Sequence, residues 1–190
     1  LMVIAAKNDL NTMTTDVANA FCTAPCMEKI WSIAGKEFGN REGSKVSLKR
    51  ALYGTKTASR SFHEFLGALM IRMGFQPSRA DQDLWWRKSD DYDGYDYLAT
   101  HVDDVLCVAK NPSQYISQIE QEFKLRDTTD EPSYYLGNDL KKMANGRIHI
   151  SSTTYTKEVI RKYQVDFGPI RKRNIPMDPK CHPELDTTPL

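Results

Sequence analysis

Two neighbouring aspartates, Asp103 and Asp104, interrupt the apolar segment HVDDVLCVA at residues 101–109. Aspartate is depleted in strand interiors and favoured in turns, so we expect a tight hairpin here with both carboxylates at or beside its tip. Two unit charges about 4 Å apart repel by roughly 4 kcal/mol at an effective dielectric constant of 20. A fold can relieve this repulsion by exposing both groups, by protonating one, or by binding a cation between them.

A divalent cation would make chemical use of such a pair. Mg²⁺ takes oxygen ligands and is commonly held by one or two carboxylates together with substrate phosphates. Two such ions roughly 3.5–4 Å apart can activate an attacking oxygen and stabilise a leaving one, which requires a further carboxylate. Asp16 is the candidate, because the segment MTTDVANAF at residues 13–21 predicts a short strand that ends near it. The alternative is a solvated turn that contains two aspartates by chance.

Several elements that must position these carboxylates follow from the sequence pattern. Apolar residues spaced three and four apart predict a helix over residues 59–74, with Gly74 at a left-handed C-terminal cap. Residues 83–88 and 95–100 predict two strands joined by a turn rich in aspartate. Three glycines and mixed charge predict a loop over residues 35–47.

The second half of the chain predicts two more helices and another hairpin. Asn111 and Pro112 are typical of a helix start, and the buried face of that helix should contain Ile116, Ile119 and Phe123. Residues 134–143 are expected to pair with residues 147–151 across an Asn-Gly turn. A last helix is expected at 153–164. Helices mixed with antiparallel hairpins indicate an α+β fold, with an antiparallel sheet packed on helices.

The bulk properties suit a soluble globular protein, because 40% of the 190 residues are hydrophobic and 27% are charged. No apolar run approaches 18 residues, so no membrane span is expected. The formal net charge of +1 neither requires nor excludes a nucleic-acid partner. The sequence begins at Leu1 with an apolar run too short for a secretory signal, and we expect a fragment of a longer intracellular protein.

The cysteines are expected to be reduced thiols, because the chain is neither small nor rich in cysteine. A zinc site is a conceivable alternative, although the spacing of its ligands lacks a paired C-x-x-C. Its ligands would be Cys22, Cys26, Cys181 and His182.

Four motifs together resemble the reverse transcriptases of Ty1/copia-type retrotransposons. They are DVANAF at 16–21, LKRALYGTKTASRSF at 48–62, HVDDVL at 101–106 and YLGNDL at 135–140, in the order found in that family. The resemblance implies a polymerase palm domain over residues 1–165. It would include part of the fingers, mainly at 29–60, and a primer-grip-like hairpin at 134–151. Residues 166–190, which contain five prolines, would be a linker or the start of a thumb or connection region, and they are expected to be disordered.

The activity implied by the resemblance is that of an RNA-directed DNA polymerase. Asp16, Asp103 and Asp104 would be the catalytic residues and would hold two Mg²⁺ ions, with Mn²⁺ as a substitute. The partners would be an RNA or DNA template with its primer, deoxynucleoside triphosphates, and the RNase H and integrase regions of the parent polyprotein. No membrane partner is implied. If the parent element is active, the location would be cytoplasmic virus-like particles.

The resemblance also implies two groups of binding residues. Nucleotide contacts would come from Val17, Ala20, Phe21, Tyr53, Gly54, Lys56 and Arg60. Primer and template contacts would come from His101, Leu136, Gly137 and Lys141.

Several of these residues can also be interpreted without the family. Gly54 permits close backbone approach, and Lys56 and Arg60 lie four apart at a helix start that attracts anions. Gly137 within a strand suggests a bulge or a close backbone contact. The resemblance implies that Phe21 lies beneath the sugar and excludes a 2′-hydroxyl, whereas without the family Phe21 is interpreted as an ordinary core residue. For Arg60 the alternative is a surface charge.

Two other functions are consistent with parts of the pattern. A catalytically inert retroelement remnant would keep the fold and weak nucleic-acid binding. Another palm-type metal enzyme, such as a nucleotidyl cyclase, would share the paired acids. It would not need the motifs LYGTKTASR and YLGNDL.

Overall fold

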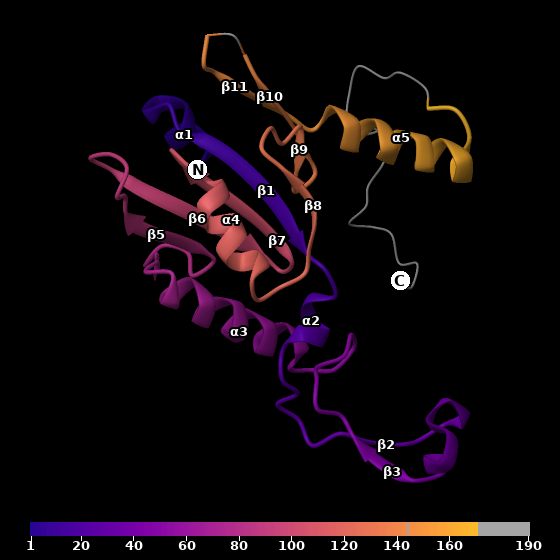
Figure 1. The fold of residues 1–190 in the computed structure, drawn as a ribbon. Helices are drawn as coiled ribbons and strands as arrows, with labels where there is room; N and C mark the ends of the chain where they lie inside the picture. The colour runs from indigo at the N-terminus through magenta and orange to yellow at the C-terminus, as the bar shows by residue number, and fades with distance from the viewer. Residues whose placement is uncertain (144, 171–190) are drawn as a thin grey trace. The chain divides into compact units, whose positions relative to one another are not determined.

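The computed structural model of the chain describes residues 1–143 and 145–170. Contacts divide the chain into two units, residues 1–151 and residues 152–190. The first unit is built on a six-stranded sheet in the order β4-β5-β6-β7-β1-β8 (Figure 1). All of its strand pairs are antiparallel, and helices pack against it. The predicted α+β fold class is therefore confirmed.

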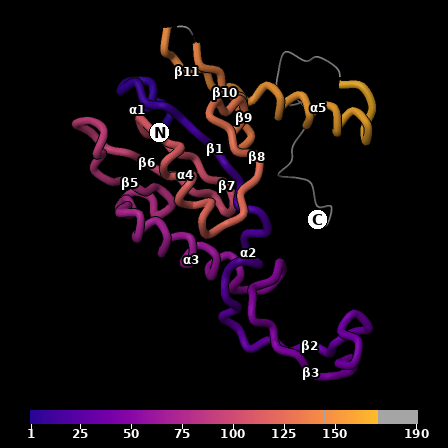
Figure 2. The backbone as a smooth tube through the Cα atoms, in the orientation of Figure 1, coloured from indigo at the N-terminus to yellow at the C-terminus, as the bar shows by residue number. Residues whose placement is uncertain are grey.

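The six strands come from widely separated parts of the first unit. Their bounds are β1 (Asn11–Val17), β4 (Gln76–Pro77), β5 (Leu84–Lys88), β6 (Tyr95–His101), β7 (Asp104–Ala109) and β8 (Leu125–Thr129). The strands predicted at 83–88 and 95–100 correspond to β5 and β6, and the hairpin predicted after them is formed by β6 and β7. In the tube view β1 runs beside β7, its antiparallel partner (Figure 2).

One face of the sheet is covered by α3 (Ala58–Arg72) and α4 (Ser113–Glu120). The main core lies between these helices and the sheet, and it includes Phe62, Leu66, Met70, Leu98, Val105, Cys107, Ile116 and Ile119. The helix predicted at 59–74 is confirmed. Gly74 follows it at φ +86°, the left-handed conformation expected of its C-terminal cap.

The start of α4 differs from the prediction. Pro112 is the N-cap residue and Ser113 begins the helix, with no side-chain cap. The Asn111 side chain accepts a hydrogen bond of 2.7 Å from the Ser113 hydroxyl instead of capping a backbone N–H group. The buried face predicted for this helix is confirmed for Ile116, Ile119 and Phe123.

The opposite face of the sheet contacts α1 (Met2–Asn8) and a small three-stranded antiparallel sheet. The strands of the small sheet are β9 (Tyr134–Tyr135), β10 (Asn138–Lys142) and β11 (Ile148–Ser151). The predicted pairing of residues 134–143 with 147–151 is confirmed for β10 and β11. Ala144, in their connection, lies outside the described residues.

Gly137 does not lie within a strand, so the bulge, one of the two alternatives for this residue, is wrong, and the close backbone contact stays a prediction. Leu136 and Gly137 form a two-residue turn between β9 and β10, in which Tyr135 pairs with Asn138. Both turn residues have positive φ, 45° and 79°, which is the pattern of a type I′ hairpin turn. Glycine serves here as a turn residue, because the chain reverses at this point.

The chain after β1 forms α2 (Ala20–Thr23) and a two-stranded hairpin of β2 (Trp31–Ile33) and β3 (Lys45–Ser47). A 3₁₀ segment (Lys36–Arg41) lies between these strands. The loop predicted over residues 35–47 is therefore wrong for the 3₁₀ segment and for β3. Such short elements have too few residues to show a hydrophobic period.

Three cysteines fall within the described residues, and all are free thiols: Cys22, Cys26 and Cys107. Cys181 and His182 lie outside the described residues, so the zinc alternative is not tested.

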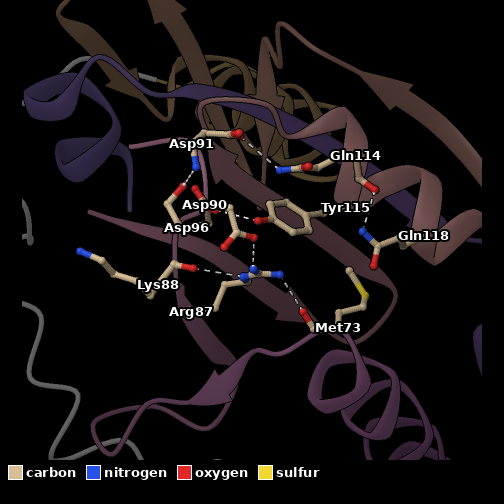
Figure 3. A network of polar contacts seen from close by, with 10 residues as sticks. Met73, Arg87, Lys88, Asp90, Asp91, Asp96, Gln114, Tyr115 and Gln118 are labelled. Carbon is tan, nitrogen blue, oxygen red and sulfur yellow. Dashed lines mark hydrogen bonds and ion pairs between the residues drawn. The ribbon is translucent and has the colours of Figure 1, made fainter. Parts of the chain in front are cut away.

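A buried carboxylate joins the sheet to the helices. Asp96 of β6 is fully buried and accepts a hydrogen bond of 2.6 Å from the Tyr115 hydroxyl of α4 (Figure 3). Burial raises the pKa of Tyr115, and the hydrogen bond to Asp96 raises it further, so the hydroxyl keeps its proton. Arg87 of β5 lies against the Tyr115 ring and donates a hydrogen bond of 3.0 Å to the Met73 carbonyl. The network thus links β5, β6 and α4 to the end of α3.

The described part of the second unit contains α5 (Thr153–Phe167), which corresponds to the helix predicted at 153–164. The linker or disordered end predicted for the tail falls largely on residues 171–190, which lie outside the described residues. In the part of the chain that the structure describes, no helix has both the length and the apolar character that crossing a bilayer requires.

We expect Leu66→Ala to lower the free energy of unfolding by about 2–5 kcal/mol, because Leu66 is buried between α3 and the sheet. Ile71→Ala is the matched control on the same helix, since Ile71 is 62% exposed. The control should change stability by less than about 0.5 kcal/mol. Urea denaturation followed by circular dichroism would compare the two, and equal losses would contradict this packing of α3.

Candidate active site

Asp16 and Asp104 lie directly opposite each other on the neighbouring strands β1 and β7. Residues paired in this way share one face of an antiparallel sheet. Along β7, Val105 belongs to the core beneath α3 and α4, whereas Leu106 belongs to the cluster that contains α1. Because side chains alternate along a strand, the two carboxylates share the face of Leu106, opposite the large helices. The structure thus brings together the early and the late aspartate that the sequence singled out.

Asp103 lies at the tip of the hairpin that leads into Asp104. His101 pairs with Asp104, so only Val102 and Asp103 form the turn. Val102 has φ +56°, a conformation that β-branched residues rarely adopt, and a positive φ at this first turn position is typical of a type II′ turn. The Asp103 carbonyl accepts a hydrogen bond of 2.8 Å from the Val17 N–H group, which ties the tip to the end of β1.

Arg126 of β8 is the cross-strand partner of Asp16 on the side away from Asp104. Its Nε lies 2.5 Å from Asp16 Oδ1 and its Nη2 lies 3.2 Å from Asp16 Oδ2, so the guanidinium binds both carboxylate oxygens. The same Nη2 lies 4.0 Å from Asp103 Oδ2. Asp16 is therefore flanked by a like charge on β7 and by an opposite charge on β8.

The surroundings of Asp104 disfavour its ionised form. Burial raises the pKa of Asp104, and the charges of Asp103 and Asp16 raise it further. The Tyr135 hydroxyl of β9 is buried and has no hydrogen-bond partner among the described residues. Burial and the charge of Asp104 raise the pKa of Tyr135 to about 12, so this hydroxyl is protonated near neutral pH.

A cavity of about 360 Å³ opens at the paired carboxylates. Its walls are β1, Asp104, part of β8 and the β9–β10 turn, and they include Asp16, Asp127, Thr129, Tyr135, Leu136 and Gly137. This volume lies within the range of roughly 300–1,000 Å³ that is usual for small-molecule sites. A larger cavity of about 700 Å³ lies elsewhere, between α1 and the strands β10 and β11.

The donor chemistry of this site fits a divalent cation, because carboxylate oxygens are the ligands that Mg²⁺ prefers. Asp16 and Asp104 line one cavity, and Asp103 approaches the same guanidinium as Asp16. Among the described residues, however, no three histidine, cysteine or acidic side chains are gathered closely enough to hold a metal ion. Arg126 engages both oxygens of Asp16, so a cation could use that carboxylate fully only after the pair separates.

Two of the predicted nucleotide contacts, Phe21 and Tyr53, lie together, with ring centroids 4.7 Å apart. Phe21 also contacts Phe62 of α3 at 6.3 Å, so its ring lies between the core and the exposed ring of Tyr53. Val17 and Ala20 are fully buried. Their side chains belong to the core, so any contact of these two residues with a nucleotide would be made by the backbone.

Gly54, Lys56 and Arg60 are exposed around the start of α3. Gly54 has φ +90°, a conformation that suits glycine. Arg60 pairs at 2.7 Å with a glutamate one turn further along the helix. At this helix start the Glu28 carboxylate accepts a hydrogen bond of 2.9 Å from the Thr57 N–H group, and the predicted nucleotide contacts stay predictions.

The predicted primer and template contacts divide between two places. His101 stands opposite Asp104 across the hairpin, and Leu136 and Gly137 line the carboxylate cavity. Lys141 lines the larger cavity beside α1, so the structure does not bring it to the carboxylates.

Arg126 and Asp127 were missed by the sequence analysis. They lie in the segment LRDTT at residues 125–129, where only the first residue is apolar. In the structure this segment is the edge strand β8, with a register shift against β1 and with φ +52° at Asp127. A polar edge strand with a bulge shows no hydrophobic alternation, so the pattern offered no signal.

Residues 1–178 match the sequence profile of a family described as "Reverse transcriptase (RNA-dependent DNA polymerase)". The chain belongs to this reverse transcriptase family. Retrovirus-related Pol polyproteins from the transposons RE1 and RE2 of Arabidopsis thaliana are 26% and 24% identical to it over 152 residues, or 77% of the chain. A putative transposon Ty5-1 protein of Saccharomyces cerevisiae is 26% identical over 156 residues, or 80% of the chain.

These matches confirm the predicted resemblance to reverse transcriptases of copia-type retrotransposons. The chain matches only 10% of the length of each Arabidopsis polyprotein and 50% of the Ty5-1 protein. Asp16, Asp103 and Asp104 fall inside the matched residues, and their catalytic role stays a prediction. The domain boundary predicted near residue 165 also stays a prediction.

We expect Asp104→Asn to raise the melting temperature of the metal-free domain by about 2 °C. The substitution removes a carboxylate whose charged form is disfavoured by burial and by two neighbouring aspartates. The gain should shrink as the pH falls, because the raised pKa allows Asp104 to take up a proton in the folded protein.

Asp16→Asn is the matched variant, since it removes the same charge but also leaves Arg126 without its partner. It should lower the melting temperature instead. Thermal unfolding in EDTA at about pH 7 measures both effects, and shifts of the same sign would contradict this view of the site.

Proposed function

We propose that this chain is the catalytic core of an RNA-directed DNA polymerase, which adds deoxynucleotides to the 3′-hydroxyl of a primer. The observation that carries the proposal is the pairing of Asp16 with Asp104 across β1 and β7, with Asp103 at the adjoining hairpin tip. Membership of the reverse transcriptase family supports it. The Pol polyproteins among the relatives support a parent polyprotein. Its RNase H and integrase regions would be further partners of this chain.

The three carboxylates would hold two Mg²⁺ ions, or Mn²⁺ in their place, against the substrate phosphates. When bound, the ions would supply activation of the primer 3′-hydroxyl and neutralisation of charge on the triphosphate. The protein itself would position the reactants, because phosphoryl transfer needs them held in line within a prepared electrostatic environment. The β1–β7 register supports this role, since it fixes Asp16 beside Asp104 in the sheet.

The β9–β10 turn supports a polymer substrate at this site. Leu136 and Gly137 line the same cavity as Asp16 and Asp104, so a primer end held by this turn would lie beside the carboxylates. Phe21 and Tyr53, whose rings lie together, would contact the sugar and base of the incoming deoxynucleotide.

The first test uses the longer parent polypeptide, because the chain matches only 10% of the length of the Arabidopsis polyproteins. We expect that polypeptide to extend a DNA primer on an RNA template with Mg²⁺. Asp103→Asn should lower the rate by about 100-fold or more, because a metal contact supplies several kcal/mol of charge stabilisation. Asp93→Asn is the matched control, since Asp93 is a fully exposed aspartate in the β5–β6 connection.

Full activity in Asp103→Asn would overturn the assignment of the carboxylates. A wild-type polypeptide that binds a primer–template duplex but never extends it would overturn the proposed polymerase. That result would support the inert retroelement remnant instead.

The second test concerns the choice of sugar. We expect Phe21→Ala to raise the incorporation of ribonucleotides relative to deoxynucleotides by about tenfold, because the ring would no longer exclude a 2′-hydroxyl. Phe38→Ala is the control, since Phe38 is an exposed phenylalanine between β2 and β3. Single-nucleotide extension assays give both rates, and an unchanged ratio would show that Phe21 is only a packing residue.

A further inference from the structure

The ion pair between Arg126 and Asp16 is placed where it competes with the proposed cation site. The guanidinium contacts Asp16 Oδ1 at 2.5 Å and Oδ2 at 3.2 Å, so it engages both oxygens that a metal would use. It also lies 4.0 Å from Asp103. A single positive group thus approaches two of the three carboxylates on which the proposed function depends.

The local charges explain why a positive group is needed here. Asp16 is opposed by Asp104 across β1 and β7, and like charges directly opposite each other destabilise a sheet. Asp127 lines the same cavity and adds a fourth carboxylate. A bidentate pair between a guanidinium and a carboxylate is among the stronger polar contacts in proteins, and it offsets part of this repulsion.

The exposure of the two partners differs in a way that permits exchange. The Asp16 side chain is 19% exposed and is held by β1, whereas the Arg126 side chain is 55% exposed on the edge strand β8. An arginine at an exposed edge can change rotamer into solvent without disturbing the core. The guanidinium can therefore leave while the carboxylate stays in place.

We propose that Arg126 is an internal counter-ion of the carboxylate site, which holds Asp16 when no divalent cation is bound and releases it when one binds. The proposal rests on the proposed function, because it concerns the same carboxylates. Arg126 is then a positioning residue whose position depends on the metal. Arg126 stabilises the carboxylate site when no cation is bound, and for the same reason it lowers the affinity of the site for the cation.

The test measures Mn²⁺ binding to the 190-residue chain by electron paramagnetic resonance or calorimetry. Arg126→Gln should bind Mn²⁺ about fivefold more tightly than the wild type, because the cation no longer displaces a guanidinium. In EDTA the same variant should melt at a lower temperature than the wild type, and saturating Mn²⁺ should remove this difference, because the wild type no longer holds the pair when the cation is bound. A residue with a purely structural role would lower stability in both conditions and would not improve binding.

Three further variants make the test specific. Arg79→Gln removes one exposed positive charge from the connection before β5 and controls for net charge. Arg126→Lys keeps the charge without the planar fork, so its gain in affinity should be smaller than that of Arg126→Gln. Asp104→Asn in the Arg126→Gln background should abolish the gain, which places the bound Mn²⁺ at the carboxylates.

The outcomes separate this inference from the proposed function. Equal or weaker Mn²⁺ binding by Arg126→Gln, with binding still lost in Asp104→Asn, would overturn the counter-ion and leave the metal site standing. Mn²⁺ binding that does not respond to Asp104→Asn in either background would overturn both. A gain of the same size in Arg79→Gln would also overturn the counter-ion, because it would reflect net charge alone.

Discussion

The site depends on one electrostatic constraint, the repulsion between Asp16 and Asp104 at the same level of two hydrogen-bonded strands. A sheet does not place like charges opposite each other without compensation. In this chain the compensation comes from the next strand, because Arg126 engages Asp16 from β8. Because β1 lies between β7 and β8, Asp16 has a like charge on one neighbouring strand and an opposite charge on the other.

The alternation of side chains along a strand lets one segment serve both the core and the site. In β7, Val105 and Cys107 pack beneath α3 and α4, whereas Asp104 takes the other face with Leu106. The helices thus stabilise the sheet without covering the carboxylates. On the carboxylate side the β9–β10 turn approaches and forms part of the cavity wall. The fold leaves room for a substrate on one face because its principal core lies on the other.

The sequence predicted those parts of the fold that have a strong period or distinctive turn chemistry. The periodic apolar residues were sufficient to predict α3, and the paired aspartates were sufficient to predict the β6–β7 hairpin. The edge strand β8 was missed because LRDTT contains a single apolar residue, and Arg126 was missed with it. Gly137 was expected within a strand, at a bulge or a close backbone contact, whereas two successive positive φ values make it part of a turn. Cross-strand partners, which decide the electrostatics, cannot be identified from either strand alone.

Val102 has a strained backbone conformation, because a valine at φ +56° has its branched side chain crowded against its own backbone. Glycine would occupy that position without strain. A copy of this gene freed from selection should therefore tolerate, and even gain folding stability from, a glycine at this codon. If related copies keep a β-branched residue at this position, selection must still act on the conformation of the β6–β7 turn.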